Sequence, residues 1–356
     1  MKMYNEGLVI GKFYPPHLGH KLLINAAIEK SEHLTVLVMG TLFDTVSLET
    51  RASMIREIHA GENVTVKAVI DHVYDDYVSK GIWKAHNVII ENSLAASPDA
   101  IFSSETYGAE LADYFGAENV CVDIDRKAVP ISATAIRKGL HTQWRYLDSV
   151  VQDYFRLKVV VMGAESTGTT TLSKALAKQY RNRGGNYSST AYVPEYGREY
   201  AEKRIEDEGT RDLAWTVKDF WNIVAGQENL YSEAFETTRS PIIVCDTDAL
   251  ATEAFGPYYG VPAGQPAVSD YGFHDGMNTN VIYLITDHEG MPLEDDGSRL
   301  TSIDDRNKST QEFINVCNKY KVPYALVSGD RLERIEIATK IIDRMVELKS
   351  FIRPPV

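Results

Sequence analysis

A short apolar run that leads through a glycine-containing loop into a helical segment occurs twice, once in each half of the chain. Residues 7–10 form a short apolar run that ends at Gly11 and is followed by helical spacing of apolar residues. The same order returns at 159–162, where an apolar run leads into a glycine-containing loop and a helical segment at 173–180. Such runs are typical of buried parallel strands that alternate with helices. The sequence therefore predicts an α/β fold with two doubly wound parallel-sheet domains.

Further apolar runs extend both patterns. Strands are expected at 34–39, 64–70, 100–103 and 120–123 in the first half and at 241–245 in the second. A connecting helix is expected over 142–155, because this segment has neither proline nor glycine. The length of 356 residues fits two cores, since single cores tend to stop growing at roughly 250 to 300 residues. We therefore predict domains over 1–156 and 157–356.

Composition limits the partners and the compartment. The formal charge of −13 opposes binding to nucleic acid or to anionic membranes, so a phosphate site has to be a local basic pocket. The N-terminus lacks the regions of a signal peptide, and no apolar run is long enough for a membrane span. The cysteines, Cys121, Cys245 and Cys317, show neither metal-ligand nor disulfide spacing, so we expect buried thiols in a reducing compartment. We predict a cytoplasmic protein whose oligomeric state stays open, a homo-oligomer being one outcome.

The segment 11–20, Gly-Lys-Phe-Tyr-Pro-Pro-His-Leu-Gly-His, carries the sharpest pattern in the chain. His17 and His20 are three positions apart at a predicted helix start, so both rings can lie on one face. Gly19 between them leaves room for a phosphate, and the helix start adds free N–H groups and a positive dipole end. The segment therefore favours a triphosphate site. The alternatives are a capped turn with incidental histidines, or a metal pair that lacks a third ligand nearby.

This segment resembles the HxGH motif of nucleotidylyltransferases, and its fuller form is similar to that of nicotinamide mononucleotide adenylyltransferases. Residues 131–137, Ile-Ser-Ala-Thr-Ala-Ile-Arg, match the second motif of that family, ISxTxIR. Taken alone, that stretch would be an ordinary helix cap followed by a solvated arginine. The resemblance implies a Rossmann-like nucleotidylyltransferase domain whose catalytic residues are His17, His20, Lys12 and Arg137. It further implies ATP-binding residues, namely Gly11, Phe13, Gly19, Ser104, Ser132 and Thr134.

Two residues are expected to bind the mononucleotide substrate. By the same resemblance, Arg51 would bind a phosphate and Trp83 would lie near a pyridine ring. Read without it, Arg51 is a surface residue of an amphipathic helix, and Trp83 is a half-buried packing residue.

The glycine-containing loop after 159–162 nearly matches the phosphate-binding loop GxxxxGK[ST]. Thr169 stands at the lysine position, while Thr170 stands where a hydroxyl normally reaches Mg²⁺. The loop predicts a set of ATP-binding residues: Gly163, Glu165, Ser166, Thr167, Gly168, Thr169, Thr170 and Thr171. Asp246 follows an apolar strand and suits a second contact to a hydrated Mg²⁺ that enters with ATP. The alternatives are a plain glycine-rich turn for the loop and a helix cap for the acidic residues after the strand.

The order and content of the second half resemble the ribosylnicotinamide kinase domain of the NadR family, in which that kinase follows an adenylyltransferase. The segments that carry the resemblance are 194–199, 225–227, 246–248 and 295–299, together with residue 306. It implies that Glu195 and Asp248 bind or activate a nucleoside 5′-hydroxyl and that Gln227 recognises the substrate. It also implies that Arg299 and Arg306 close over the phosphates from a lid. The alternatives are that the acidic residues are simply exposed to solvent and that 295–306 is a solvated loop.

The combined resemblance implies a bifunctional enzyme of NAD biosynthesis, with ATP, nicotinamide mononucleotide and ribosylnicotinamide as its small-molecule substrates. The chain begins almost directly on its first strand, so we do not expect the DNA-binding repressor domain of some family members. The missing lysine leaves two alternatives open. One is an adenylyltransferase with a degenerate kinase domain, and the other is a nucleotide-sensing module without turnover.

Overall fold

The computed structural model describes residues 2–73, 82–262, 264–265, 280–290 and 303–354. The chain forms two compact units, of which the first comprises Met1–Tyr154 together with Ser350–Val356 and the second comprises Phe155–Lys349. The junction thus lies two residues before the expected boundary. The last seven residues, which we had assigned to the second domain, belong to the first unit.

The first unit is a parallel five-stranded sheet with helices on both faces. Its strands are β1 (Tyr4–Gly11), β2 (Ser31–Gly40), β3 (Val64–Ile70), β4 (Ala100–Ser103) and β5 (Glu118–Cys121), in the order β3-β2-β1-β4-β5. Val9 points to the face covered by α1 (Leu18–Ile28) and α2 (Leu48–Ile58). Leu8 and Ile10 point to the other face, covered by α3 (Ile82–Ser93) and α4 (Tyr107–Phe115). This strand-by-strand alternation produces the doubly wound architecture predicted from the sequence.

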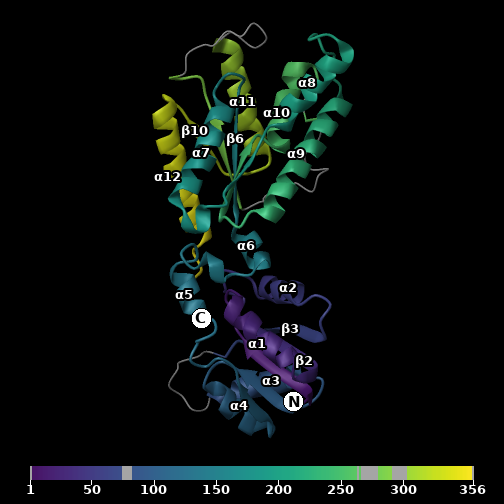
Figure 1. Cartoon of the computed structure of the whole chain (residues 1–356), viewed down its shortest axis with the longest axis vertical. Helices are drawn as coiled ribbons and strands as arrows, with labels where there is room; N and C mark the ends of the chain where they lie inside the picture. The colour runs from purple at the N-terminus through teal and green to yellow at the C-terminus, as the bar shows by residue number, and fades with distance from the viewer. Residues whose placement is uncertain (1, 74–81, 263, 266–279, 291–302, 355–356) are drawn as a thin grey trace. The chain divides into compact units, whose positions relative to one another are not determined.

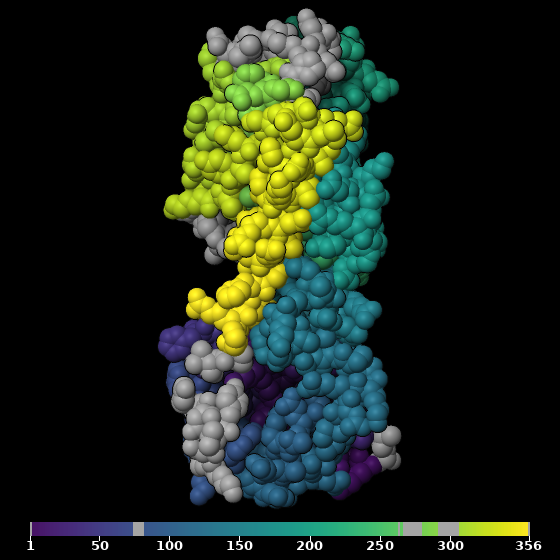
Figure 2. Space-filling model, turned by 90° about the vertical axis from the view of Figure 1, so that its left-hand side faces the viewer, coloured from purple at the N-terminus to yellow at the C-terminus, as the bar shows by residue number. Residues whose placement is uncertain are grey.

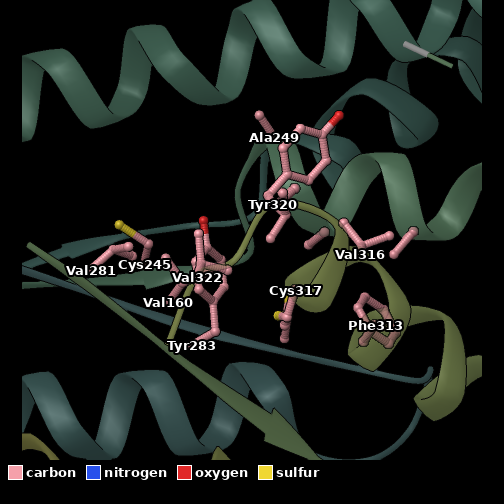
Figure 3. Close-up of a cluster of buried hydrophobic side chains, with 14 of the residues drawn as sticks. Val160, Cys245, Ala249, Val281, Tyr283, Phe313, Val316, Cys317, Tyr320 and Val322 are labelled. Atoms are coloured by element: carbon pink, nitrogen blue, oxygen red, sulfur yellow. The ribbon is translucent and has the colours of Figure 1, made fainter. Parts of the chain in front are cut away.

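The second unit repeats the plan with a longer set of elements (Figure 1). Its strands are β6 (Leu157–Gly163), β7 (Ala191–Val193), β8 (Ile242–Asp246), β9 (Val281–Thr286) and β10 (Tyr324–Val327), in the order β10-β9-β6-β8-β7. The helices α9 (Val217–Thr237), α10 (Ala249–Phe255) and α11 (Ile303–Lys319) cover one face. The helices α7 (Thr169–Arg183) and α12 (Arg331–Lys349) cover the other, and α8 (Tyr196–Glu208) packs against α9. Figure 3 shows the first of these cores, where Tyr283 and Phe313 lie among valine and cysteine side chains.

Three details differ from the sequence predictions. The expected helix over 142–155 is broken into a short 3-10 turn, Trp144–Tyr146, and the helix α6 (Ser149–Phe155), because Leu147 between them is extended. Strand β5 lies two residues earlier than expected, and Cys121 at its end is exposed while the other two cysteines are buried.

No helix in the described part of the chain has the length and apolar character needed to cross a membrane.

The C-terminal tail should contribute to the stability of the first unit. Ile352 is buried in this tail whereas its neighbour Phe351 is largely exposed, and the backbone N–H of Arg353 donates to the Thr45 hydroxyl (3.2 Å). Burial of an isoleucine side chain is worth roughly 1.5 to 3 kcal/mol. We therefore expect Ile352→Ala to lower the free energy of unfolding of the first unit by about 2 kcal/mol, measured by urea denaturation. The Phe351→Ala control should unfold like the wild type, and equal effects of the two changes would contradict this role of the tail.

Candidate active site

The two histidines of the first motif are fixed by the backbone of the helix that they begin. His17 is the N-cap of α1, and its Nδ1 accepts a hydrogen bond from the Gly19 N–H (3.1 Å). His20, one turn later, accepts the His17 N–H on its own Nδ1 (3.3 Å). The two rings stack with centroids 3.7 Å apart. A β-carbon on Gly19 would lie 3.0 Å from the His17 ring, so glycine is the residue that leaves this stack undisturbed.

These contacts decide which nitrogens face a ligand. Because Nδ1 is the acceptor in both rings, the proton of each neutral imidazole is on Nε2. Burial, aided by the positive charges of Arg126 and Arg137, lowers the pKa of His17 to about 4. Burial and the neighbouring His17 and Arg126 hold the pKa of His20 well below its ordinary value. At neutral pH the pair therefore presents two uncharged Nε2–H donors side by side.

The low pKa of His17 predicts a specific loss of stability in acid. A histidine with a lower pKa in the folded state binds fewer protons there than in the unfolded chain, so unfolding becomes easier as the pH falls. Between pH 6.5 and pH 4 the contribution of His17 should amount to roughly 3 kcal/mol, and above pH 6.5 it should vanish. We expect His17→Asn, which keeps a capping side chain, to remove this part of the pH dependence of urea unfolding. The same slope in both proteins would contradict the buried, neutral state of His17.

The histidine pair lies in a pocket of about 1240 Å³ at the carboxyl ends of the strands. Figure 2 shows a hollow in which purple residues from the start of the chain lie behind blue residues of later segments. All predicted ATP-binding and catalytic residues of the first domain line it: Gly11, Lys12, Phe13, His17, Gly19, His20, Ser104, Ser132, Thr134 and Arg137. The structure thus brings together two motifs that are more than a hundred residues apart in sequence.

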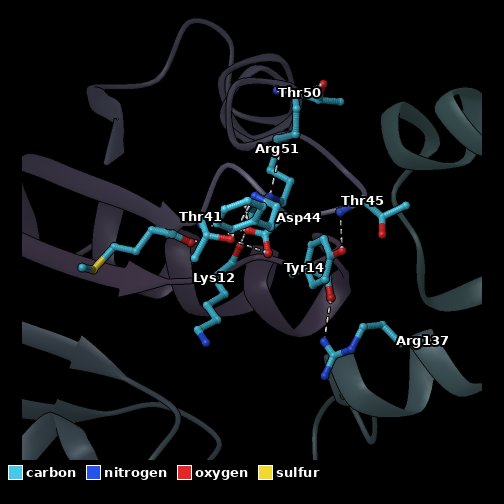
Figure 4. Close-up of polar contacts among 11 residues, drawn as sticks. Lys12, Tyr14, Thr41, Asp44, Thr45, Thr50, Arg51 and Arg137 are labelled. Atoms are coloured by element: carbon cyan, nitrogen blue, oxygen red, sulfur yellow. Dashed lines mark hydrogen bonds and ion pairs between the residues drawn. The ribbon is translucent and has the colours of Figure 1, made fainter. Parts of the chain in front are cut away.

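The second motif also lines this pocket. Ser132 is the N-cap of the short helix α5 (Ala133–Lys138), and its hydroxyl accepts the Ala135 N–H (3.2 Å). Arg137 donates to the carbonyl of Tyr14 (2.8 Å) and to the hydroxyl of Thr134 (3.0 Å). These contacts hold the guanidinium beside the first motif (Figure 4).

Arg51 has a different position from the one we expected. Its side chain is fully buried and does not line the pocket, so it is neither a surface residue nor placed to bind a substrate phosphate. The guanidinium pairs with Asp44 (2.6 Å) and donates to the carbonyl of Lys12, as Figure 4 shows. Because a buried guanidinium needs such partners, Arg51 serves to fix the loop that carries Lys12.

The pocket is also lined by charged and polar side chains that the sequence analysis did not single out. Arg126 lines it and pairs with Glu105 (3.3 Å), and its charge acts on both histidines. Asp71 and His86 face each other in the same pocket, close to Trp83, which lines the pocket as expected. Arg126 could have been noticed as a basic residue just before the second motif. Asp71 and His86 belong to no recognisable sequence motif, because only the fold brings the end of β3 next to α3.

In the second unit, the phosphate loop joins β6 to α7 as expected from the sequence. Ser166 (φ 58°) and Gly168 (φ 83°) have left-handed backbones, and Gly168 is the N-cap of α7. Thr169, Thr170 and Thr171 form the first turn of the helix. Glu165 accepts a hydrogen bond from the Tyr259 hydroxyl. The loop thus has the curved backbone that forms a nest for phosphate groups.

Two contacts that the sequence did not suggest hold this loop. Thr167 is buried, and its hydroxyl bonds to that of Thr286 at the end of β9 (2.7 Å). Its carbonyl accepts a hydrogen bond from Arg334 of α12 (2.6 Å), whose buried guanidinium also donates to the carbonyls of Asp287, Glu289 and Gly329. Thr167 therefore contributes to the site by shaping the loop, since its hydroxyl is already engaged. A Cβ on Gly163 would lie 2.3 Å from the Thr286 hydroxyl, which explains glycine there.

Asp246 ends β8 beside the phosphate loop, because β8 pairs with β6. The Tyr192 hydroxyl donates to Oδ2 (3.3 Å), while the buried Oδ1 has no hydrogen-bond partner in the part of the chain that the structure describes. Burial raises the pKa of the Asp246 carboxyl, and the Thr170 and Tyr192 hydroxyls and the charges of Arg198 and Lys174 oppose the rise. An orphaned buried carboxylate oxygen next to a threonine hydroxyl fits a cation that is bound together with a nucleotide.

Asp248 and Gln227 need correction as candidate substrate contacts. Asp248 is buried as the N-cap of α10: Oδ1 accepts two backbone N–H groups, and Oδ2 accepts the Tyr283 hydroxyl (2.8 Å) and pairs with Lys158 (3.3 Å). Gln227 is buried, and its amide bonds to the N–H of Tyr196 and the carbonyl of Pro194. Both side chains are occupied by the protein itself. The helix-cap alternative is therefore correct for Asp248, and Gln227 fixes the turn that carries Glu195.

The remaining candidates are placed as follows. Glu195 is half-buried at the start of α8 and pairs with Arg198 (3.5 Å). Arg306 is buried on α11 instead of lying on an exposed loop, and its Nε has no partner within the described residues. Arg299 lies outside the described residues. Among the described residues, no group of three or more histidine, cysteine or acidic side chains is arranged to hold a metal.

Comparison with known proteins agrees with both halves of this description. Residues 8–190 match the family model described as cytidylyltransferase-like, and residues 158–334 match one described as an AAA domain. The trifunctional NAD biosynthesis/regulator protein NadR of Escherichia coli is 27% identical over 91% of this chain and 79% of its own length. The NadR of Salmonella typhimurium is 26% identical over 76% of this chain and 67% of its own length.

A solved structure agrees with the fold along nearly the whole chain. The crystal structure of a NadR protein in complex with NR covers 98% of both chains at 23% identity, with a TM-score of 0.64. These matches confirm the resemblance to NadR-type proteins that the motifs suggested, and they confirm the order of a nucleotidylyltransferase-like domain before a phosphate-loop domain. Because the cytidylyltransferase-like model matches more than half of its residues, the chain belongs to the cytidylyltransferase-like family.

Proposed function

We propose that the first unit transfers the AMP part of ATP to nicotinamide mononucleotide and so makes NAD. The observation that carries this proposal is the pair of Nε2–H donors of His17 and His20, in one pocket with Lys12 and Arg137. The names of the NadR relatives, which refer to NAD biosynthesis, support it.

The chemistry needs positioned donors and no covalent intermediate. An oxygen of the 5′-phosphate of the mononucleotide forms a bond to the α-phosphorus of ATP, and the bond from that phosphorus to the β-phosphate oxygen breaks. Negative charge grows on the oxygens around the α-phosphorus and on the leaving pyrophosphate. Fixed donors in a pocket stabilise this charge without having to reorganise, which is where His17, His20 and Arg137 act. Lys12, which is exposed at the mouth, neutralises the phosphate chain.

We further propose that the second unit phosphorylates ribosylnicotinamide. The γ-phosphoryl group of ATP passes to the nucleoside 5′-hydroxyl, and ADP leaves. The phosphate loop would hold the triphosphate, and Glu195 beside Arg198 would receive the hydroxyl. Thr170 and Asp246 would hold Mg²⁺, which neutralises phosphate charge when it is bound. The solved NadR complexes with NR and with NAD and AMP-PNP support this assignment of ligands.

Thr169 is the feature that this kinase proposal has to accommodate, because a threonine offers no charge to the β- and γ-phosphates. Arg198 and Lys174 both act on Asp246, so positive charge is present at the described part of the site. The resemblance implies Arg299 as a further source of positive charge, and this residue lies outside the described residues. A degenerate or sensory second unit is the alternative.

One experiment distinguishes an active kinase from a degenerate or sensory second unit. Wild type, Thr169→Lys and Arg299→Ala are given ATP, Mg²⁺ and ribosylnicotinamide, and the ADP released is measured. We expect an active wild type that Arg299→Ala impairs. A wild type without activity, together with an active Thr169→Lys variant, would contradict the kinase proposal and favour a degenerate domain.

A further inference from the structure

The pocket of the first unit holds a pair of polar side chains that adenylyl transfer does not use. Asp71 directly follows β3, and His86 lies on the second turn of α3. His86 Nδ1 lies 2.6 Å from Asp71 Oδ2, and the two side chains are only 15% and 12% exposed. Asp71 Oδ1 accepts the Val73 N–H (3.0 Å), and its own N–H donates to the Gly40 carbonyl. The aspartate is therefore held by its backbone and by both carboxylate oxygens.

This arrangement fixes the tautomer of His86. A carboxylate accepts only, so Nδ1 carries the proton that it donates to Asp71. In the neutral imidazole, Nε2 is then a hydrogen-bond acceptor. Within the described residues Nε2 has no hydrogen-bond partner, although the residue lines the pocket. His86 thus offers the opposite chemistry to His17 and His20, which present donors.

Aromatic side chains next to this pair provide a surface for a planar ring. Trp83 stacks on Tyr107, with ring centroids 5.6 Å apart at 26°, and meets His86 at 5.9 Å in an edge-on arrangement. Tyr107 is tied to the end of β1, because its hydroxyl donates to the Ile10 carbonyl (3.0 Å), and burial raises its pKa to about 12. Trp83 and Tyr107 therefore form an uncharged aromatic wall, and the His86–Asp71 pair lies next to it.

We propose that His86, oriented by Asp71, is a specificity-determining residue that reads the substituent of the pyridine ring and selects an uncharged amide over a carboxylate. This inference rests on the proposed adenylyltransferase function of the same pocket. An amide donates an N–H to the Nε2 acceptor. A carboxylate has no hydrogen to donate, and its negative charge adds to that of Asp71.

The test compares kcat and KM for nicotinamide mononucleotide and nicotinic acid mononucleotide in wild type and variants. The wild type should prefer the amide. Asp71→Asn removes the charge and keeps the size, so the ratio of kcat/KM values should fall about tenfold, mainly by improved use of the acid. His86→Ala should raise KM for the amide about tenfold and leave kcat nearly unchanged, since it removes uniform binding. His86→Gln keeps an acceptor and should restore much of the preference.

Lys84→Ala, an exposed change on the same helix, is the matched control and should behave like the wild type. An unchanged ratio in Asp71→Asn and His86→Ala, with circular dichroism showing both folded, would overturn the inference. An increased KM for ATP in place of the mononucleotide would overturn it as well, because the pair would then read the adenine. A wild type that uses neither mononucleotide would instead contradict the proposed function itself.

Discussion

His20→Ala is expected to lower the turnover number for NAD formation about 10²- to 10³-fold, because loss of one preorganised donor to a developing oxyanion typically costs that much. The ring of His20 is fixed by the His17 N–H and by stacking, so its Nε2–H is aimed before substrate binds. KM for both substrates should change much less than kcat, since the interaction strengthens only in the transition state. Initial rates of NAD formation from nicotinamide mononucleotide and ATP measure the effect.

His17 requires a different substitution, because its side chain also caps α1. Loss of a cap costs about 1 kcal/mol, so His17→Ala would mix a stability effect with a catalytic one. His17→Asn keeps the cap and removes the Nε2–H, and we expect a loss of activity of about 10²-fold. His33→Ala changes an exposed histidine of β2 and serves as the control. Near-normal turnover in both His20→Ala and His17→Asn would show that this pocket does not transfer adenylyl groups by the proposed route.

Two aspartates that are two residues apart in the second unit should respond in opposite ways to the same change. Asp246→Asn should lower the rate of ribosylnicotinamide phosphorylation by about 10²-fold or more, since a carboxylate that holds the phosphate-bound cation would be lost. Its free energy of unfolding should change little or rise, because a buried carboxylate oxygen without a hydrogen-bond partner is removed.

Asp248→Asn should instead destabilise the second unit by about 3 to 5 kcal/mol, because Lys158 would lose its nearest carboxylate in a buried position. Burial opposes the charge of Lys158, but Asp248 and Glu228 outweigh it and raise the pKa of the ammonium, so the group stays charged. Urea denaturation measures the loss, and NAD formation by the first unit is the internal control for both variants. An Asp248→Asn protein as stable as wild type but inactive as a kinase would restore Asp248 as a catalytic residue.

The sequence predicted the parts of the fold that depend on local pattern. The apolar runs and the glycines at their ends identified most strands and the two glycine-containing loops that follow β1 and β6, since the burial of a strand and the curvature of a loop depend on consecutive residues. The break in the predicted connecting helix escaped detection because Leu147 is extended without a proline or glycine to mark the position. The C-terminal tail was misassigned because its place depends on contacts with residues such as Thr45, far away in the chain.

The site residues also divide into those marked by a local sequence motif and those whose environment depends on tertiary contacts. That His17 and His20 lie together could be predicted because they are three positions apart at one helix start, and Arg137 was singled out because its motif marks a second helix start. Asp248, Gln227 and Arg51 were misjudged because only the tertiary contacts show that each polar group already has partners within the protein. Asp71 and His86 were missed for the converse reason, as two unremarkable residues become a pair when α3 packs over the end of β3.

If the two units catalyse consecutive steps, the whole protein should convert ribosylnicotinamide to NAD in a single assay. Pure protein receives ribosylnicotinamide, ATP and Mg²⁺, and the products are followed by chromatography. We predict that nicotinamide mononucleotide appears first and NAD accumulates, with one ADP and one pyrophosphate formed for each NAD. Formation of NAD only when nicotinamide mononucleotide is supplied would contradict the two-step account and leave the second unit without its proposed reaction.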